Sequence, residues 1–199
     1  MTEGLKIIDN FLDEYHFNEL AKIVLGEKFP WFYIENVSLP IEDHITSDPL
    51  AIETSGLNHV SLDREWEVQS FTYNLLLPFF DKLRTELGYA ESDLIRVRFS
   101  MKLQKIGYTS DNYNLPHVDY YYPHDTIIFY INDSDGDTRL FDQWFDPTTG
   151  INQTKFTTQE RITPKANRLV LFNGLQYHTA SNPICSGKRV ILNINLDSK

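Results

Sequence analysis

The sequence of 199 residues contains one cysteine, Cys185, and no run of about 18 consecutive apolar residues. A single cysteine cannot form a disulfide within the chain, which argues against a disulfide-stapled secreted scaffold and favours a reducing, cytoplasmic location. Without a long apolar run, we expect no membrane-spanning helix. The opening MTEGLKIIDNFLDEY has neither a basic segment nor a continuous apolar one, so we expect no signal peptide.

Positive charge is also scarce, since 18 Lys and Arg stand against 28 Asp and Glu for a formal net charge of −10. An acidic surface repels phosphate backbones and anionic lipid head groups, so we expect neither general nucleic-acid binding nor membrane binding. Hydrophobic residues make up 41% and aromatics 14%, which is enough for a sizeable core and favours packed strands. The length predicts one domain, and no feature of the sequence indicates an oligomeric state.

The first ninety residues have a mixed, partly helical pattern. A short strand is expected at residues 5–11, and apolar spacing predicts a helix from Asp13, as N-cap, to a stop at Gly26. A second helix is predicted from about Glu65 to Leu87, with a kink at Pro78. Residues 30–62, rich in Pro, Ser and Asp, are expected to be irregular.

After Gly88 the pattern changes to short strands separated by turn residues. In the first of these strands apolar and polar residues alternate, as in a strand with one buried face. The spacing favours a sandwich or a barrel, and a jelly roll is one of the few solutions. The predicted strands are Ile95–Ile106, Pro116–Tyr121, Thr126–Asn132, Thr138–Phe141, Arg168–Phe172, His178–Ser181 and Arg189–Leu196.

One of the six histidines lies in an H-x-D pattern, His117 with Asp119. Side chains at i and i+2 of a strand point the same way, so both can reach one ion. With His178 they make a two-histidine, one-carboxylate set, which leaves positions open on a non-haem Fe(II). A lone histidine near a strand end is more often structural, and an aspartate is more often a solvated turn residue. The H-x-D pair therefore becomes informative only in combination with a residue that could hold a cosubstrate.

Arg189 lies after His178, at the start of an alternating strand. Val190, Leu192, Ile194 and Leu196 form one face, and Arg189 shares the other with Ile191, Asn193 and Asn195. A guanidinium on such a semi-polar face suits the distal carboxylate of a chelating 2-oxo acid, although a surface salt bridge would use the same residue. Lys188 has the opposite parity and is the weaker candidate.

Several stretches occur in the order of motifs in the 2-oxoglutarate- and Fe(II)-dependent oxygenases. FYINDSDGDTRLF is similar to the family's tyrosine-containing strand and the stretch after it. NRLVLFNG before His178 is similar to the strand leading into the second histidine, and NPICSGKR to the turn before the arginine strand. Together with the H-x-D pattern, they make residues 95–196 resemble the core of prolyl 4-hydroxylase-like proteins, including phage-type members.

The resemblance implies one oxygenase domain over residues 1–199. Residues 1–90 would form a partly helical lead-in, and residues 94–199 a mainly-β double-stranded β-helix, or jelly roll, with the N-terminal helices supporting it. It also implies an Fe(II) site and a 2-oxoglutarate cosubstrate. Three residues would then bind the iron: His117, Asp119 and His178.

For the cosubstrate, the resemblance implies that Arg189 pairs with the distal carboxylate of 2-oxoglutarate. Thr138 matches a position that can contact the cosubstrate, and Tyr130 can add a hydroxyl to the same carboxylate. Whether further residues line that pocket stays open for Lys102, Gln104, Tyr108 and Tyr113. Gln104 stands where prolyl hydroxylases commonly have a tyrosine, and the segment Trp144–Ile162 has no counterpart.

The resemblance therefore implies a dioxygenase that uses O2 and 2-oxoglutarate to hydroxylate a substrate still to be identified. A protein or peptide side chain, proline included, ranks first. Two alternatives stay open: a nucleobase or small-molecule hydroxylase of the same chemistry, and a non-catalytic jelly-roll binding protein. Because Asp119 is present, no ligand position is vacated for a halide, and hydroxylation is expected rather than halogenation.

Overall fold

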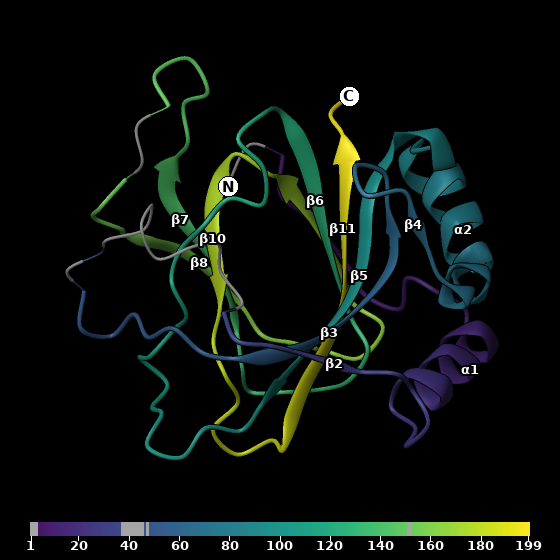
Figure 1. Cartoon of the computed structure of the whole chain (residues 1–199), viewed down its shortest axis with the longest axis horizontal. Coiled ribbons are helices and arrows are strands. Elements are labelled where there is room, and N and C mark those ends of the chain that lie inside the picture. The colour runs from purple at the N-terminus through teal and green to yellow at the C-terminus, as the bar shows by residue number, and fades with distance from the viewer. Residues whose placement is uncertain (1–3, 37–45, 47, 151–152) are drawn as a thin grey trace.

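The computed structural model describes residues 4–36, 46, 48–150 and 153–199. Two antiparallel sheets face each other, and two helices lie on the outer side of the larger sheet (Figure 1). The architecture is the jelly roll that the sequence predicts. None of the helices in the described ranges is long and apolar enough to cross a membrane.

The larger sheet has eight strands and the smaller one three. The order in the larger sheet is β1 (Lys6–Ile8), β9 (Leu169–Asn173), β6 (His124–Tyr130), β11 (Lys188–Asp197), β5 (Leu94–Leu103), β3 (Gly56–Asp63) and β2 (Phe32–Ile34), with β4 (Val68–Gln69) paired to β3. The order in the smaller sheet is β10 (Gln176–Ala180), β7 (Thr138–Trp144) and β8 (Thr158–Ile162).

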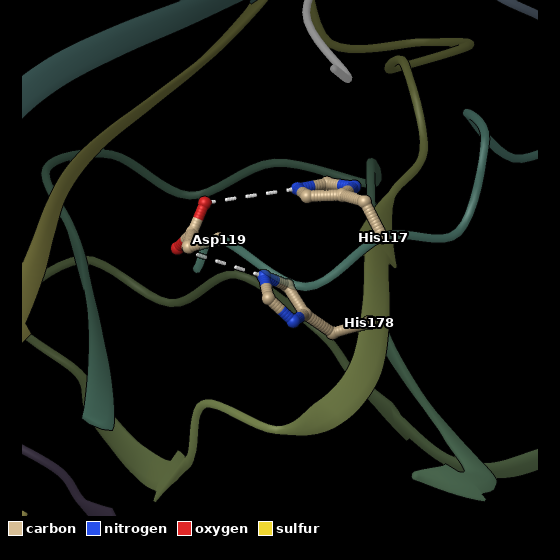
Figure 2. Close-up of side chains that lie close together, drawn as sticks. All are labelled: His117, Asp119 and His178. Carbon is tan, nitrogen blue, oxygen red and sulfur yellow. Dashed lines mark ion pairs between the residues drawn. The ribbon is translucent and has the colours of Figure 1, made fainter. Parts of the chain in front are cut away.

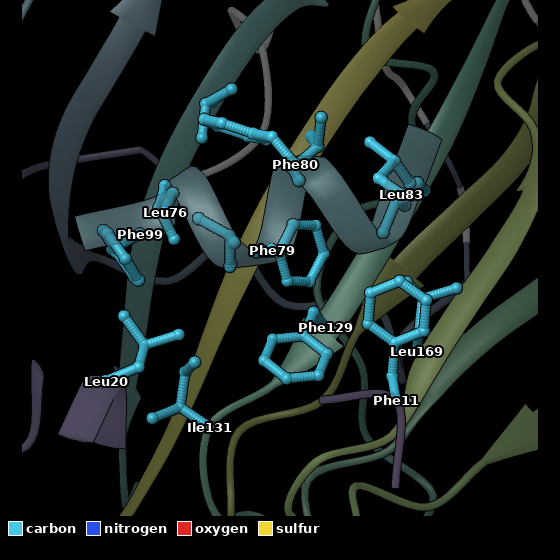
Figure 3. Packing of buried hydrophobic residues seen from close by; sticks show 14 of the residues in the cluster. Phe11, Leu20, Leu76, Phe79, Phe80, Leu83, Phe99, Phe129, Ile131 and Leu169 are labelled. Carbon is cyan, nitrogen blue, oxygen red and sulfur yellow. The ribbon is translucent and has the colours of Figure 1, made fainter. Parts of the chain in front are cut away.

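The main hydrophobic core lies between the larger sheet and the helices. Helix α1 (Glu14–Val24) begins where the Asp13 side chain accepts a hydrogen bond from the backbone N–H of His16, and α2 (Leu77–Leu87) ends at Gly88, whose φ is 79°. The rings of Phe11, Phe79 and Phe129 pack together in this core, with the centroids of Phe79 and Phe129 5.0 Å apart (Figure 3). This packing uses the outer face of the sheet and leaves the inner face for a site.

Strand β11 shows how one sequence pattern serves both faces. Its residues of even number, Val190 to Leu196, are buried in the core under the helices. Its residues of odd number, Arg189, Ile191 and Asn193, line a pocket between the two sheets. The alternation predicted from the sequence is confirmed, since successive side chains of a strand point to opposite faces.

Strand β5 differs from the expectation of one buried face. Its polar residues Ser100 and Lys102 are 9% and 5% exposed, because the smaller sheet covers this side as well. The alternation of apolar and polar residues was predicted correctly, but the polar face was expected to be exposed and is instead covered. These side chains line the pocket rather than facing bulk solvent.

The helix predicted over residues 65–87 is wrong in its first half. The chain instead forms β4, then the short 3-10 helix η2 (Phe71–Leu76), before α2 begins at Leu77. Pro78 lies in the first turn of α2, where its missing N–H is not needed, so it starts a helix rather than kinking one. Ser70 caps η2 by accepting from the backbone N–H of Thr72.

The expectation that residues 30–62 are irregular is also wrong in part, since they contain β2 and most of β3. The polar residues Asn58 and His59 of β3 are buried, so the strand lacks a simple apolar alternation. Residues 37–45 and 47 lie outside the described residues. Strand β8 was missed because four of its five residues are exposed, which removes the alternating signal.

Candidate metal centre and its pocket

A pocket of about 590 Å³, its open mouth included, lies between the two sheets. Side chains reach it from β5, β6, β7, β10 and β11 and from the segment that precedes β6. The polar members of its lining are Arg98, Ser100, Lys102, Asn114, His117, Asp119, Thr138, His178, Thr179, Arg189 and Asn193. The histidines, the aspartate and the arginine singled out by the sequence all lie in this one pocket.

The segment that carries His117 and Asp119 is not the regular strand predicted at Pro116–Tyr121. It meets β10 at a single bridge, in which the backbone N–H groups of His117 and His178 each donate to the other residue's carbonyl, at 3.0 and 2.9 Å. The two imidazole rings are thereby brought to 4.7 Å between centroids. One pair of backbone hydrogen bonds is enough to place both histidines.

The three candidate ligands converge as the sequence predicts (Figure 2). The Nε2 atoms of His117 and His178 each lie 3.9 Å from a carboxylate oxygen of Asp119, one on each oxygen. One donor atom from each residue lies within 4.8 Å of the other two, so a single ion between them is within reach of all three. The side chains of Asp119 and His178 are each only 5% exposed.

Each histidine is oriented by a hydrogen bond from its other ring nitrogen. Nδ1 of His117 lies 3.1 Å from the carbonyl oxygen of Leu115, and Nδ1 of His178 lies 3.2 Å from that of Gln176. Because a carbonyl only accepts, Nδ1 carries the proton in both rings and Nε2 offers its lone pair to the pocket. Burial lowers the pKa of His178, so its ring is neutral at pH 7, the form that binds a metal.

Asp119 is held by three side chains of the larger sheet. Arg96 donates to Oδ1 at 3.1 Å, while Asn195 and Asn193 donate to Oδ2 at 2.8 and 3.4 Å. Burial alone would raise the pKa of Asp119. The charge of Arg96, aided by both histidines, outweighs it and keeps the pKa well below its usual range. The carboxylate is therefore ionised and fixed in orientation.

These supporting residues were not predicted as part of the site. The signal was present in the strand register, because Asn193 and Asn195 share the face of Arg189, and Arg96 pairs with Asn195 across β5 and β11. The sequence does not show that Asp119 lies against this face of the sheet.

Asn195→Ala is expected to weaken Fe(II) binding by roughly 10- to 100-fold, because it removes the shortest hydrogen bond that orients Asp119. The measurement is Fe(II) affinity by anaerobic calorimetry. Ser198→Ala, beyond the end of β11, serves as the control and should leave the affinity unchanged. Equal affinities for wild type and Asn195→Ala would show that Asn195 does not position the aspartate.

Arg189 lies at the other end of the inner face. One of its terminal nitrogens donates to the Thr138 hydroxyl at 2.7 Å, and the Tyr130 hydroxyl donates to the same oxygen at 2.7 Å. Arg189 is 3% exposed, its Nε has no hydrogen-bond partner, and within the part of the chain that the structure describes it forms no ion pair. Arg189, Thr138 and Tyr130 thus cluster as the sequence predicts, around a buried cation that lacks an anion.

Of the four residues whose place in the pocket the sequence left open, one lines the pocket and three do not. Lys102 lines the pocket, where burial lowers its pKa well below the usual range. Gln104, Tyr108 and Tyr113 are not among the lining residues. The amide of Gln104 donates to the carbonyl of Ile184, and the Tyr113 hydroxyl donates to Asp48 instead.

No family model matches the sequence, and no curated protein matches it. Solved structures do match. One is a 2OG-Fe(II) oxygenase family oxidoreductase from Burkholderia pseudomallei, with a TM-score of 0.62 at 10% identity over 98% of this chain and 85% of that one. Another is a Pseudomonas putida prolyl-4-hydroxylase, with a TM-score of 0.56 at 14% identity over 100% and 94%.

A third match is the non-heme alpha-ketoglutarate-dependent epimerase SnoN from nogalamycin biosynthesis, with a TM-score of 0.61 at 14% identity over 98% of this chain and 79% of that one. The chain therefore has the fold of the 2-oxoglutarate- and Fe(II)-dependent oxygenases, prolyl hydroxylases among them. The resemblance inferred from the sequence motifs is confirmed in the fold.

Proposed function

We propose that this protein is an Fe(II)- and 2-oxoglutarate-dependent dioxygenase that hydroxylates a substrate bound in the pocket between the two sheets. The observation that carries the proposal is the presence in one pocket of His117, Asp119 and His178 together with Arg189, a buried guanidinium without an anion. A barrel with only a structural role needs neither the three metal-binding side chains nor an unpaired buried arginine beside them.

The donor set fits Fe(II). Two neutral imidazoles and one carboxylate suit a divalent iron and leave coordination positions for other molecules. The Nδ1 hydrogen bonds and the ion pair of Asp119 with Arg96 hold the three donors before a metal arrives. When bound, the iron supplies the oxidising chemistry, in which O2 and 2-oxoglutarate are consumed, succinate and CO2 are released and a C–H bond of the substrate is hydroxylated.

The protein's own residues bind and orient the reactants. Arg189 offers a fork of donors to the distal carboxylate of 2-oxoglutarate, and the hydroxyls of Thr138 and Tyr130 lie beside it. The aliphatic side chains of Ile128 and Ile191 also line the pocket, which limits the access of water to the reacting centre.

The substrate proposed first is a protein or peptide side chain, proline included. This ranking is supported by the sequence resemblance and by the prolyl hydroxylases among the matching structures, one of which is in complex with a peptide fragment. A small molecule comes second, because nogalamycin-pathway enzymes share the fold. The acidic net charge of −10 weighs against a nucleobase within nucleic acid.

The test is succinate formation from 2-oxoglutarate by the Fe(II)-loaded protein in air, with proline peptides, free amino acids, small carboxylic acids and nucleosides offered in turn. We expect iron-dependent succinate release that rises with one substrate class. A protein that binds neither Fe(II) nor 2-oxoglutarate would instead be a jelly-roll binding protein.

A further inference from the structure

Arg98 is a pocket residue that the proposed chemistry of iron and cosubstrate does not use. It lies on β5 and pairs in register with Asn193 of β11, one step along the inner face from Arg96. The cosubstrate cluster extends the other way, because Arg189 reaches Thr138 on β7 and stands over the ring of Tyr130 on β6. Since β11 lies between β5 and β6, Arg98 and this cluster are on opposite flanks of β11.

Arg98 differs from Arg96, Arg139 and Arg189 in having no partner among the described residues. Arg96 is paired with Asp119, Arg189 donates to Thr138, and Arg139 donates to three backbone carbonyls of residues 110–112. Among the described residues, Arg98 forms no hydrogen bond and no ion pair, and its Nε is buried without an acceptor. Arg98 is half-buried, and a guanidinium in such a place normally finds an acceptor, so one left without a partner in a pocket indicates an absent anion.

The charges around Arg98 also indicate that an anion is missing. Burial lowers the pKa of Arg98 to about 10, so the group is still a cation at neutral pH. Its nearest acidic neighbours are already engaged, since Asp119 is paired with Arg96, and Asp63 accepts the backbone N–H groups of Glu65 and Trp66. The charges of Fe(II) and of the 2-oxoglutarate dianion cancel. Binding of both therefore supplies no counter-charge to Arg98.

We infer that Arg98 binds a carboxylate of the substrate, which makes the substrate a carboxylic acid. The inference rests on the proposed function, and among its candidate substrates it favours the small molecule over the peptide side chain. A guanidinium presents two parallel donors that match a carboxylate, while a neutral prolyl side chain or a nucleobase leaves the charge unpaired. Lys102, further along the same face of β5, also lines this wall of the pocket, but its Nζ already donates to the Thr54 hydroxyl at 2.8 Å.

The test uses protein loaded with Fe(II) and saturating 2-oxoglutarate under anaerobic conditions, so that small acids cannot occupy the cosubstrate position. The probes are acetate, benzoate and N-acetyl-L-proline, each compared with its primary amide by ligand-observed NMR. We expect the acids to bind and the amides to bind at least roughly tenfold more weakly, because only the acids form the charge-assisted pair.

Arg98→Gln should weaken binding of the acids by at least about tenfold, and Arg98→Lys should restore part of it. The 2-oxoglutarate affinity should be unchanged in both variants, which also shows that they are folded. Acids that bind no better than amides, or an acid preference that survives Arg98→Gln but is lost in Lys102→Met, would overturn the inference. So would a loss of 2-oxoglutarate affinity in Arg98→Gln, which would make Arg98 a cosubstrate residue and leave the proposed function standing.

Discussion

His117→Ala and Asp119→Ala are each expected to abolish both Fe(II) binding and turnover. Each variant removes one of three donors whose atoms converge within 4.8 Å. Asp119→Ala in addition leaves Arg96 without its counter-charge next to the metal position, which further opposes a cation there. Wild-type protein should take up about one iron per chain, and the measurement is bound iron after anaerobic loading and desalting, followed by succinate formation.

The matched control is His16→Ala, since His16 lies on helix α1, is hydrogen-bonded to Asp13 and does not line the pocket. It should bind iron and turn over as wild type does. Thermal unfolding of all variants separates loss of metal from loss of fold. Full activity in His117→Ala or Asp119→Ala would mean that the metal ligands are assigned incorrectly.

Arg189→Ala is expected to weaken 2-oxoglutarate binding by about two orders of magnitude or more. Two charge-assisted hydrogen bonds to the distal carboxylate are lost, each contributing roughly 1.5–3 kcal/mol, and about 1.4 kcal/mol corresponds to a tenfold change in affinity. Iron binding should persist, because the triad is untouched. The measurement is 2-oxoglutarate affinity of the anaerobic Fe(II)-loaded variant.

Lys188→Ala provides the control for this prediction. Lys188 is the neighbouring cation on β11, has the opposite parity and is not among the residues that line the pocket. Its replacement should change the affinity little. A large loss in Lys188→Ala together with none in Arg189→Ala would mean that the strand register assigned to the cosubstrate cluster is wrong.

Much of the site was predictable because it depends on local periodicity. Arg189, Asn193 and the alternating apolar residues of β11 follow from a period of two, and the H-x-D pattern places two ligands close together whatever the backbone between them. The jelly roll followed from the resemblance of ordered motifs rather than from the periodicity, which also allowed other sandwiches and barrels.

What the sequence did not reveal depends on contacts between distant segments. Arg98 and Lys102 have the pattern of a solvent-facing strand side, and only the smaller sheet turns that side into a pocket wall. Arg96 and Asn195 become supports of the centre only because the segment before β6 brings Asp119 onto them. Strands β3 and β8 were missed for opposite reasons, since β3 buries polar side chains and β8 exposes nearly all of its own.

The most direct test of the account is an anaerobic calorimetric titration of 2-oxoglutarate into the wild-type protein with and without Fe(II). The account predicts saturable binding of about one 2-oxoglutarate per chain, much tighter with iron than without, because the metal and Arg189 hold opposite ends of the molecule. Absence of binding, or binding that is indifferent to iron, would contradict it.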